Sequence, residues 1–275
     1  EKTSNNEKTS NNEKEYVIGG GFFGKVLKFK ITDTRCINNN VTTTCKNLKY
    51  NKSYILKTVC KGDDSNSEDN KNELKYELDI FNYLNKLNEY NPINHWSDRI
   101  PKSYGDNIWE IELDNGVNLE AKCGRGLKPL FNYCFILDMC PYGSLKNYIK
   151  DKNPDEDTKL RFLSDIAKGI SYMHSKGIIH RDIASRNILI CGNEFNEIAK
   201  ITDFGLAVRI NKPDILQYET DTTKKLLLPW RFTDPLFYIN SPQYFNFISD
   251  GWAFACTILE VMIGRDDFYS DIKRK

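Results

Sequence analysis

The sequence of 275 residues lacks long apolar runs, and its charges nearly balance. Its longest apolar segments are only a few residues, such as 134–137, whereas a helix needs about 20 apolar residues to cross a bilayer. We therefore expect no membrane segment in this chain. No charged-then-apolar leader opens the sequence, so no secretory signal is visible. The formal net charge of +1 predicts no nucleic acid partner.

Closely spaced cysteine pairs are missing as well. The eight cysteines are scattered along the chain, and none of them forms a C-x-x-C pair. Zinc and redox sites commonly use such pairs, and disulfide frameworks are typical of small secreted domains. The scatter therefore predicts reduced thiols in a cytoplasmic protein.

Several segments lack apolar residues almost entirely. Residues 1–14 repeat the hexapeptide EKTSNN and contain nothing to bury, so they predict a disordered, low-complexity tail. Polar residues rich in Asn and Lys also fill 37–53 and 61–72, which we interpret as surface loops between core elements. Ordered sequence is expected from about Tyr16.

Hydrophobic periodicity places strands before helices in the remaining chain. Strands are predicted by alternation or short apolar runs at 27–31, 54–59, 108–113, 131–138, 178–179, 187–190 and 198–202. Helices are predicted by apolar stripes at 72–87, at 157–176 with Gly177 as its stop, and at 249–264. The last helix is apolar nearly all round, which favours a central position. A small β-rich part should precede a larger helical part.

A glycine-rich segment, GGGFFGKV, runs from Gly19 to Val26 and fits the pattern G-x-G-x-x-G-x-V. Glycine lets backbone N–H groups approach a phosphate closely, where a Cβ atom would collide. A strand follows the segment, where a Rossmann motif would open a helix, and the G-K-[ST] ending of a Walker loop is missing. By itself the segment is equally compatible with a hairpin turn.

Lys57 and Glu77 form a second candidate pair. Lys57 lies in a short apolar strand, where a lone lysine usually faces solvent. Glu77, however, lies on the apolar stripe of the helix predicted at 72–87. A carboxylate on a buried face is costly unless a cation meets it, so we expect Lys57 to pair with Glu77.

Acidic and amide side chains gather in two loops that follow predicted strands. The segment IIHRDIASRNIL places Asp182 and Asn187 between apolar runs, and Asp203 opens the sequence DFG after another strand. Asn187 and Asp203 can together hold Mg²⁺, which prefers oxygen ligands. Asp182 can accept the proton of an attacking hydroxyl.

In this combination and order the motifs resemble the signature of the eukaryotic protein kinases, from about Tyr16 to the end. The resemblance implies an α+β, bilobal fold. It would have a small antiparallel β N-lobe with one key helix and a larger, mainly helical C-lobe. The kinase domain would span 15–275, with the N-lobe at about 15–137, the hinge at about 138–142 and the C-lobe at 143–275. The family normally adds three helices beyond the last one here, so we expect a fragment with an incomplete C-lobe.

The resemblance also implies roles for individual residues. Asp182 would be the catalytic base, and Arg186 would be a further catalytic residue. Lys57 would contact the α- and β-phosphates of ATP, Glu77 would anchor that lysine, and Asn187 with Asp203 would hold Mg²⁺. The residues implied to bind ATP are Ile18, Gly19, Gly20, Gly21, Phe22, Phe23, Gly24, Val26, Lys57, Asp138, Met139, Cys140 and Leu189. Asp250 matches the aspartate that supports the catalytic loop. The implied partners are ATP and a protein substrate, in the cytoplasm or in the cytoplasmic part of a longer receptor.

Two features favour tyrosine over serine or threonine as the acceptor. Ala184 stands where serine/threonine kinases usually carry lysine, and Arg186 follows two residues later. The segment around Pro229 likewise resembles the part of tyrosine kinases that positions the acceptor peptide. Serine/threonine specificity is the alternative.

Two other residues depart from the family pattern. Ile55 replaces the usual alanine above adenine, and Leu236 replaces a glutamate that usually anchors the activation segment. These departures keep a second alternative open, a pseudokinase that binds nucleotide or acts as a scaffold without phosphoryl transfer.

Overall fold

The computed structural model divides the chain into two compact units, one formed by 1–82 and 102–139 and the other by 83–101 and 140–275. The first unit ends after Met139, inside the segment predicted as the hinge. The tail predicted at 1–14 lies outside the described residues, as do Phe22 and Phe23. The structure describes residues 17–21, 24–30, 48–49, 51–60, 67–86, 95–110, 131–210, 217–219, 229–239 and 244–264.

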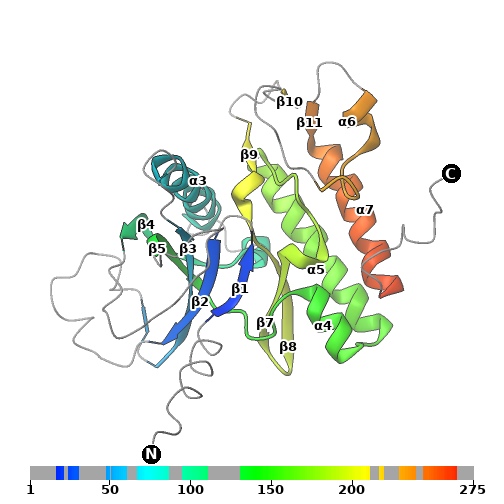
Figure 1. The fold of residues 1–275 in the computed structure, drawn as a ribbon. Coiled ribbons are helices and arrows are strands. Elements are labelled where there is room, and N and C mark those ends of the chain that lie inside the picture. The colour runs from blue at the N-terminus through cyan, green and yellow to red at the C-terminus, as the bar shows by residue number, and fades with distance from the viewer. Residues whose placement is uncertain are drawn as a thin grey trace, which may run out of the picture. The chain divides into compact units, whose positions relative to one another are not determined.

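The first unit contains a five-stranded antiparallel sheet with the strand order β1-β2-β3-β5-β4 (Figure 1). Its strands are β1 (Val17–Gly21), β2 (Gly24–Lys30), β3 (Ser53–Cys60), β4 (Ser103–Glu110) and β5 (Phe131–Asp138). Side chains alternate between the two faces of a strand, so neighbouring residues of β5 such as Phe135 and Ile136 project to opposite faces and have different neighbours. Phe135 contacts Phe81 of helix α3 (Ser67–Lys86), with ring centroids 5.9 Å apart. The cluster of Leu48, Tyr54, Tyr104 and Ile136 is buried elsewhere in this unit.

Helix α3 begins before the predicted position. Residues 67–72 form its first turns, so the interpretation of this part of 61–72 as a loop was wrong. The apolar stripe starts only at Leu74, and periodicity could not detect the polar turns before it. Glu68 and Asp69 suit this end of the helix because acidic side chains interact favourably with the N-terminal dipole.

The second unit is mainly helical, and α5 packs against α7 (Figure 1). Its helices are α4 (Leu145–Lys152), α5 (Glu156–Ser175), α6 (Pro235–Ile239) and α7 (Phe247–Ile263). Among the described residues, three short antiparallel pairs accompany them: β6 (Ile178–Ile179) with β9 (Val208–Arg209), β7 (Ile188–Asn193) with β8 (Asn196–Ile201), and β10 (Gln217–Glu219) with β11 (Tyr244–Asn246). Single 3₁₀ turns are η3 (His95–Arg99), η4 (Ser185–Asn187) and η5 (Phe204–Leu206). These elements confirm the α+β architecture expected of a kinase fold.

Local signals set the limits of the long helices. Asp155 caps α5 by accepting a hydrogen bond from the backbone N–H of Thr158 at 2.8 Å. Gly177 follows the end of α5 with φ of 72°, and a Cβ atom there would lie 2.9 Å from the carbonyl oxygen of Ile210. Glycine is therefore required at this stop, as the sequence predicted. At α7, Asn246 and Ser249 form a reciprocal capping box.

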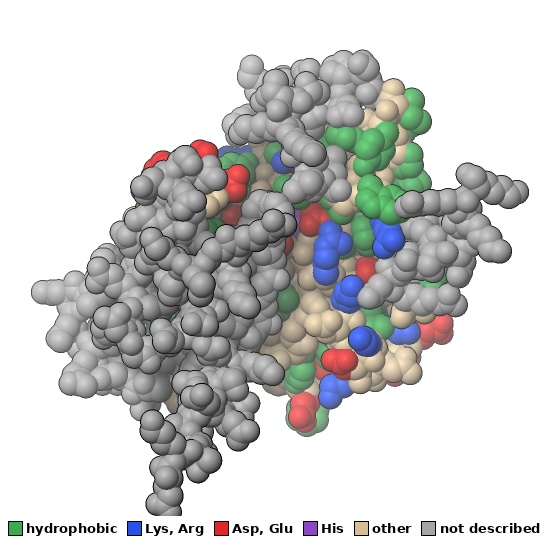
Figure 2. All heavy atoms as spheres, viewed as in Figure 1, with side chains coloured by type: hydrophobic (Ala, Val, Ile, Leu, Met, Phe, Trp, Pro, Cys, Tyr) green, Lys and Arg blue, Asp and Glu red, His purple; other side chains and the backbone are tan. Residues whose placement is uncertain are grey.

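Helix α7 is less enclosed than its apolar sequence predicted. Ala253, Cys256 and Val261 are buried, but Ile248 is 71% exposed and Leu259 48% exposed. One side of α7 is therefore exposed, although the apolar sequence favoured a central position for this helix. Figure 2 shows part of the exposed apolar surface near α6 and α7. In the described part of the chain, no helix is both long enough and apolar enough to span a membrane.

The structure corrects the prediction that all cysteines are reduced. The sulfur atoms of Cys140 and Cys191 form a disulfide, with a Cα–Cα distance of 4.2 Å. Residue spacing could not reveal this bond, because the two cysteines are 51 positions apart in the sequence. They meet because the turn after β5 lies against β7, where Tyr142 donates a backbone hydrogen bond to Ile190.

Candidate active site

The glycine-rich segment contributes residues to two paired antiparallel strands of the first unit, β1 and β2. Gly19 pairs with Val26 across β1 and β2, and Val26 pairs in turn with Lys57 of β3. Lys57 then pairs with Phe135 of β5. Directly paired residues on antiparallel strands project to the same face, so Val26, Lys57 and Phe135 share one face of the sheet. This is the face that α3 covers.

Lys57 and Glu77 meet as the sequence predicted. The Nζ atom of Lys57 lies 2.6 Å from Oε1 of Glu77, and the Glu77 side chain is only 4% exposed. Helix α3 therefore brings a buried carboxylate to the lysine on β3. A charge-assisted hydrogen bond of this length offsets part of the desolvation cost of both groups.

Substituting Glu77 with glutamine is expected to lower the free energy of unfolding by about 1–3 kcal/mol, because Lys57 loses its charged partner in a buried setting. Asp79→Asn is the matched control, since Asp79 forms an exposed ion pair with Lys75 on the same helix. Its expected effect is about 0.5 kcal/mol or less. Urea unfolding followed by tryptophan fluorescence measures both. Equal losses in the two variants would contradict a special role for the buried pair.

The residues predicted to read adenine lie in both units, and their joint role stays a prediction. Asp138 ends β5, and its carboxylate accepts hydrogen bonds from Lys52 at 2.7 Å and from the Tyr104 hydroxyl at 2.8 Å. Cys140 lies in the second unit, as does Leu189 of β7, which forms an isolated β-bridge with Ser144. Met139 is half-buried in the first unit, and the backbone of Ile18 lies in β1 of the same unit.

Ile55 occupies a buried position on β3, where it is 7% exposed and pairs with Leu137 of β5. It lies two residues before Lys57, so both side chains project to the same face. The expectation that Ile55 narrows the space for adenine stays a prediction.

In the second unit, two neighbours hold the Asp182 carboxylate in place. Arg186 forms an ion pair with Oδ1 of Asp182. Asn187 donates from Nδ2 to Oδ2 of Asp182 at 2.7 Å and to its carbonyl oxygen at 2.9 Å. Arg186 and Asn187 follow Asp182 by four and five residues. The 3₁₀ turn η4 folds the chain back, so that both side chains reach the Asp182 carboxylate. Three of the predicted residues thus form one cluster.

Asp250 anchors the backbone of the same loop from α7. It is fully buried and accepts hydrogen bonds from the backbone N–H of His180 at 2.8 Å and of Arg181 at 2.9 Å. His174 contacts the same carboxylate at 2.8 Å. The support predicted for Asp250 is therefore present in the structure.

His180 connects this loop with the strand that precedes Asp203. Its Nδ1 accepts a hydrogen bond from the backbone N–H of Asp182 at 3.3 Å, and its Nε2 lies 3.1 Å from the carbonyl oxygen of Thr202. Because a carbonyl can only accept, Nε2 must carry the hydrogen. The His180 ring also packs on Phe204, with centroids 5.1 Å apart.

Arg181 and Asp203 both have left-handed backbone conformations, with φ of 67° and 68°. Such conformations are uncommon outside glycine and concentrate at functional sites.

Burial raises the pKa of Asp182 above its ordinary value, and the nearby charge of Asp203 adds to this effect. Three neighbours act in the opposite direction and partly offset this rise in the pKa: Arg186, His180 and Asn187. Two acidic groups therefore lie close enough to influence each other.

The donor set suits a hard divalent cation. Asn187 uses its Nδ2 atom to bind Asp182, which orients its amide oxygen as the remaining ligand atom. With the Asp203 carboxylate, this oxygen fits the preference of Mg²⁺ for oxygen ligands. These two residues would hold the metal.

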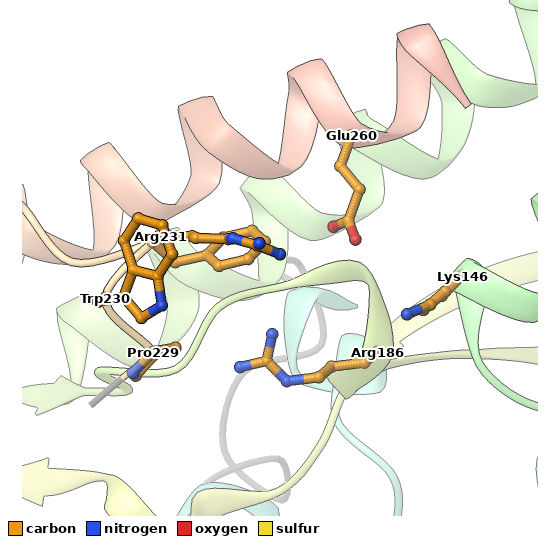
Figure 3. A pocket seen from close by; sticks show the side chains of 7 residues that line it. Lys146, Arg186, Pro229, Trp230, Arg231 and Glu260 are labelled. Atoms are coloured by element: carbon orange, nitrogen blue, oxygen red, sulfur yellow. The ribbon is translucent and has the colours of Figure 1, made fainter. Parts of the chain in front are cut away.

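Two residues near this cluster, Lys146 and Glu260, were not predicted from the sequence as part of a site. They line a cavity together with Arg186 and with Pro229, Trp230, Arg231 and Phe232 of the segment that was predicted to position the acceptor peptide (Figure 3). A signal existed for Glu260, because it is a carboxylate within the apolar helix predicted at 249–264, as Glu77 is within its own helix. Lys146 carries no such signal, since exposed and buried cations look alike in a sequence.

Comparison with known proteins agrees with this geometry. Residues 108–275, more than half of the chain, match the family of protein tyrosine and serine/threonine kinases, and the chain belongs to this family. It is 36% identical over 140 residues to serine/threonine-protein kinase ppk21 of Schizosaccharomyces pombe, covering 49% of this chain and 24% of the relative.

Two further relatives match a similar share of the chain. Serine/threonine-protein kinase PLK4 of Xenopus laevis is 31% identical over 143 residues, covering 51% of this chain and 14% of the relative. Fibroblast growth factor receptor homolog 2 of Drosophila melanogaster is 29% identical over 182 residues, covering 58% of this chain and 16% of the relative. The chain thus spans a quarter or less of the length of these relatives.

Proposed function

We propose that this kinase domain transfers the γ-phosphoryl group of ATP to a hydroxyl group of a protein substrate, with tyrosine as the acceptor. The observation that carries the proposal is the Asp182 cluster, in which Arg186 and Asn187 fix both carboxylate oxygens. A carboxylate held in this way can orient the acceptor hydroxyl and accept its proton as the new phosphorus–oxygen bond forms.

The other site residues support the same reaction. Asn187 and Asp203 would hold Mg²⁺, which neutralises phosphate charge when bound. Lys57, fixed by Glu77, is proposed to contact the α- and β-phosphates. All five residues that the family uses for transfer are present, which favours an active enzyme over a pseudokinase.

Arg186 supports tyrosine as the acceptor. Ala184, at the position of the usual serine/threonine-kinase lysine, is fully buried and carries no charge. Arg186 provides the cation instead, and its guanidinium lies 5.4 Å from the ring centroid of Phe232. Arg186 therefore contacts both the Asp182 carboxylate and the segment 229–232. A phenol reaches further from its backbone than a serine hydroxyl, so a rigid platform beside the base favours it.

Serine/threonine specificity is the second candidate, favoured by the names of ppk21 and PLK4. The test is incubation of the chain with Mg-ATP and one of three substrates: poly(Glu,Tyr), casein or a panel of small-molecule alcohols. Phosphoamino-acid analysis identifies the acceptor in the two polypeptides, and phosphate transfer to the alcohols is measured separately. We expect phosphotyrosine in poly(Glu,Tyr), formed about 10²–10⁴-fold more slowly by the Asp182→Asn variant. Phosphoserine or phosphothreonine alone would establish the second candidate. ATP binding without transfer to any substrate would indicate a pseudokinase.

The pH dependence of kcat/KM should report the environment of Asp182. Its pKa is raised, so the carboxylate becomes protonated, and unable to accept a proton, at a higher pH than an ordinary aspartate. The acidic limb of the profile should therefore lie above about 3.9. Circular dichroism over the same pH range separates this limb from unfolding. A limb at the ordinary aspartate value in the folded protein would contradict the assignment.

A further inference from the structure

The disulfide between Cys140 and Cys191 joins the segment that enters the second unit to strand β7. Both cysteines belong to this unit, although they are 51 positions apart in the sequence. Cys140 lies in the segment predicted as the hinge, and Leu189, two residues before Cys191, was predicted to bind ATP. Figure 1 shows β7 beside α4, the helix to which this segment leads. The bond is therefore placed where it can hold the second unit's share of the predicted nucleotide site.

Backbone hydrogen bonds hold the same segment on β7 without help from the sulfur atoms. The N–H group of Tyr142 donates to the carbonyl oxygen of Ile190 at 3.3 Å, and the N–H group of Ile190 donates to Gly143 at 2.9 Å. Ser144 and Leu189 form an isolated β-bridge next to these bonds. The turn can therefore stay on β7 whether the two cysteines are bonded or reduced.

The surroundings of the bond also suit both oxidation states. Helix α4 packs against β7, and Leu145, Ile188 and Ile190 are fully buried. This packing does not depend on the sulfur atoms. The Sγ atom of Cys191 lies 3.9 Å from the carbonyl oxygen of Leu189, so a thiol formed there has an acceptor in place. The fold is thus compatible with the disulfide and with two thiols.

The disulfide lies just below the protein surface. Cys140 is 8% exposed and Cys191 6% exposed, and each is followed by an exposed residue, Pro141 and Gly192 respectively. A small thiol therefore has a short path to the sulfur atoms. Such a pair differs from the disulfide frameworks of small secreted domains, because the eight cysteines of this chain are scattered.

We propose that Cys140 and Cys191 form a redox-sensitive clamp that controls how tightly the chain binds ATP. The proposal rests on the kinase function proposed above and adds a form of regulation to it. Glutathione, a low-molecular-weight thiol, supplies the electrons. One glutathione thiolate attacks a sulfur atom of the disulfide and forms a mixed disulfide, which a second glutathione then cleaves. The protein gains two electrons and two protons as two thiols, and the two glutathione molecules leave joined as glutathione disulfide.

The oxidised form is expected to bind ATP more tightly. In this form the disulfide fixes the backbone at Cys140 before the nucleotide arrives, so less conformational entropy is lost on binding. In the reduced form only the hydrogen bonds hold the turn. We expect the Kd of Mg-ATP to rise about 3- to 10-fold on reduction, a part of the cost of ordering the backbone of one residue.

The test places the natural chain in buffers with different ratios of reduced to oxidised glutathione. Alkylation followed by peptide mass spectrometry gives the fraction of the Cys140–Cys191 bond, and calorimetric titration with Mg-ATP gives the Kd in the same samples. Circular dichroism shows whether both forms are folded. The bond should open and reform reversibly, and the Kd should follow it. A bond that persists at every ratio, or a chain that unfolds when the bond opens, would overturn the proposal.

Variants locate the effect in this pair. Cys191→Ser should bind Mg-ATP with the affinity of the reduced chain at every glutathione ratio, and Cys140→Ser should lose the dependence on glutathione in the same way. Cys256→Ala is the matched control, because Cys256 is a buried cysteine of α7 that takes no part in this bond. It should keep the full dependence. A Kd that still follows the glutathione ratio in Cys191→Ser would assign the effect to other cysteines and overturn the clamp.

The outcomes separate this proposal from the proposed function. A Kd that follows the state of the bond, without phosphoryl transfer in either state, would support the clamp and reject the kinase activity. Phosphoryl transfer with the same Kd in both states would overturn the clamp and leave the kinase activity in place. No binding of Mg-ATP in either state would reject both.

Discussion

Replacing Asp182 with asparagine is expected to lower kcat by about 10²–10⁴-fold, the usual contribution of a general base. Asparagine keeps the size of the side chain and still accepts a hydrogen bond, but it cannot take a proton. Its amide group has a single oxygen atom, so it cannot offer separate acceptor atoms to Arg186 and Asn187, as the two carboxylate oxygens of Asp182 do. Initial rates with poly(Glu,Tyr) and saturating Mg-ATP measure the loss.

Nucleotide affinity should distinguish a chemical defect from a structural one. Calorimetric titration with Mg-ATP should give the same Kd for Asp182→Asn and the natural protein, within about twofold, because Asp182 is assigned to the acceptor hydroxyl. Asp151→Asn, an exposed substitution at the end of α4, is the matched control and should leave kcat unchanged. A variant that keeps more than about a tenth of the natural kcat would contradict the base assignment.

Replacing Asp250 with alanine is expected to lower the free energy of unfolding by about 3–5 kcal/mol. The substitution removes the acceptor of two backbone N–H groups, those of His180 and Arg181, and of the contact with His174. The site is fully buried, so water cannot easily replace the lost partner. Because the backbone of the catalytic loop is then released, kcat should fall as well.

Asp157→Ala is the control for this prediction. Asp157 lies in the first turn of α5 as Asp250 lies in the first turn of α7, but it is exposed. Its loss therefore reports only the interaction with the helix dipole, about 0.3–1 kcal/mol. Urea unfolding compares the two variants. Similar losses would show that Asp250 acts through the dipole and that its hydrogen bonds to the loop contribute little.

Helix and strand limits show how far local signals reach. The strand predicted at 131–138 coincides with β5, and the helix predicted at 157–176 lies within a residue of α5 at each end. Both have strong apolar periodicity, and α5 has a capping residue and a glycine stop. The helix α4, at 145–152, was not predicted. It is short and mostly polar, and its burial of Leu145 and Ile149 depends on partners from other parts of the chain.

The pairing of distant residues could be predicted only where a buried charge demanded a partner. Glu77 on an apolar stripe required a cation, and Lys57 lies 2.6 Å away. Asp165 of α5 is a second buried carboxylate with a cationic partner: it is 4% exposed and pairs with Arg99 at 2.9 Å. Asp165 also accepts a hydrogen bond from the backbone N–H of Ala199, so it joins three elements.

By itself, the sequence determined the order of the motifs, the types of the main elements and the chemical groups available for catalysis. These properties depend on residue identity, spacing and local caps, which are all contained in short stretches of chain. The tertiary structure decided which groups meet. It placed Arg186 on Asp182, Asp250 beneath the loop, Cys140 against Cys191, and three cations around one cavity. Such contacts depend on the packing of elements far apart in sequence, and no local pattern specifies that packing.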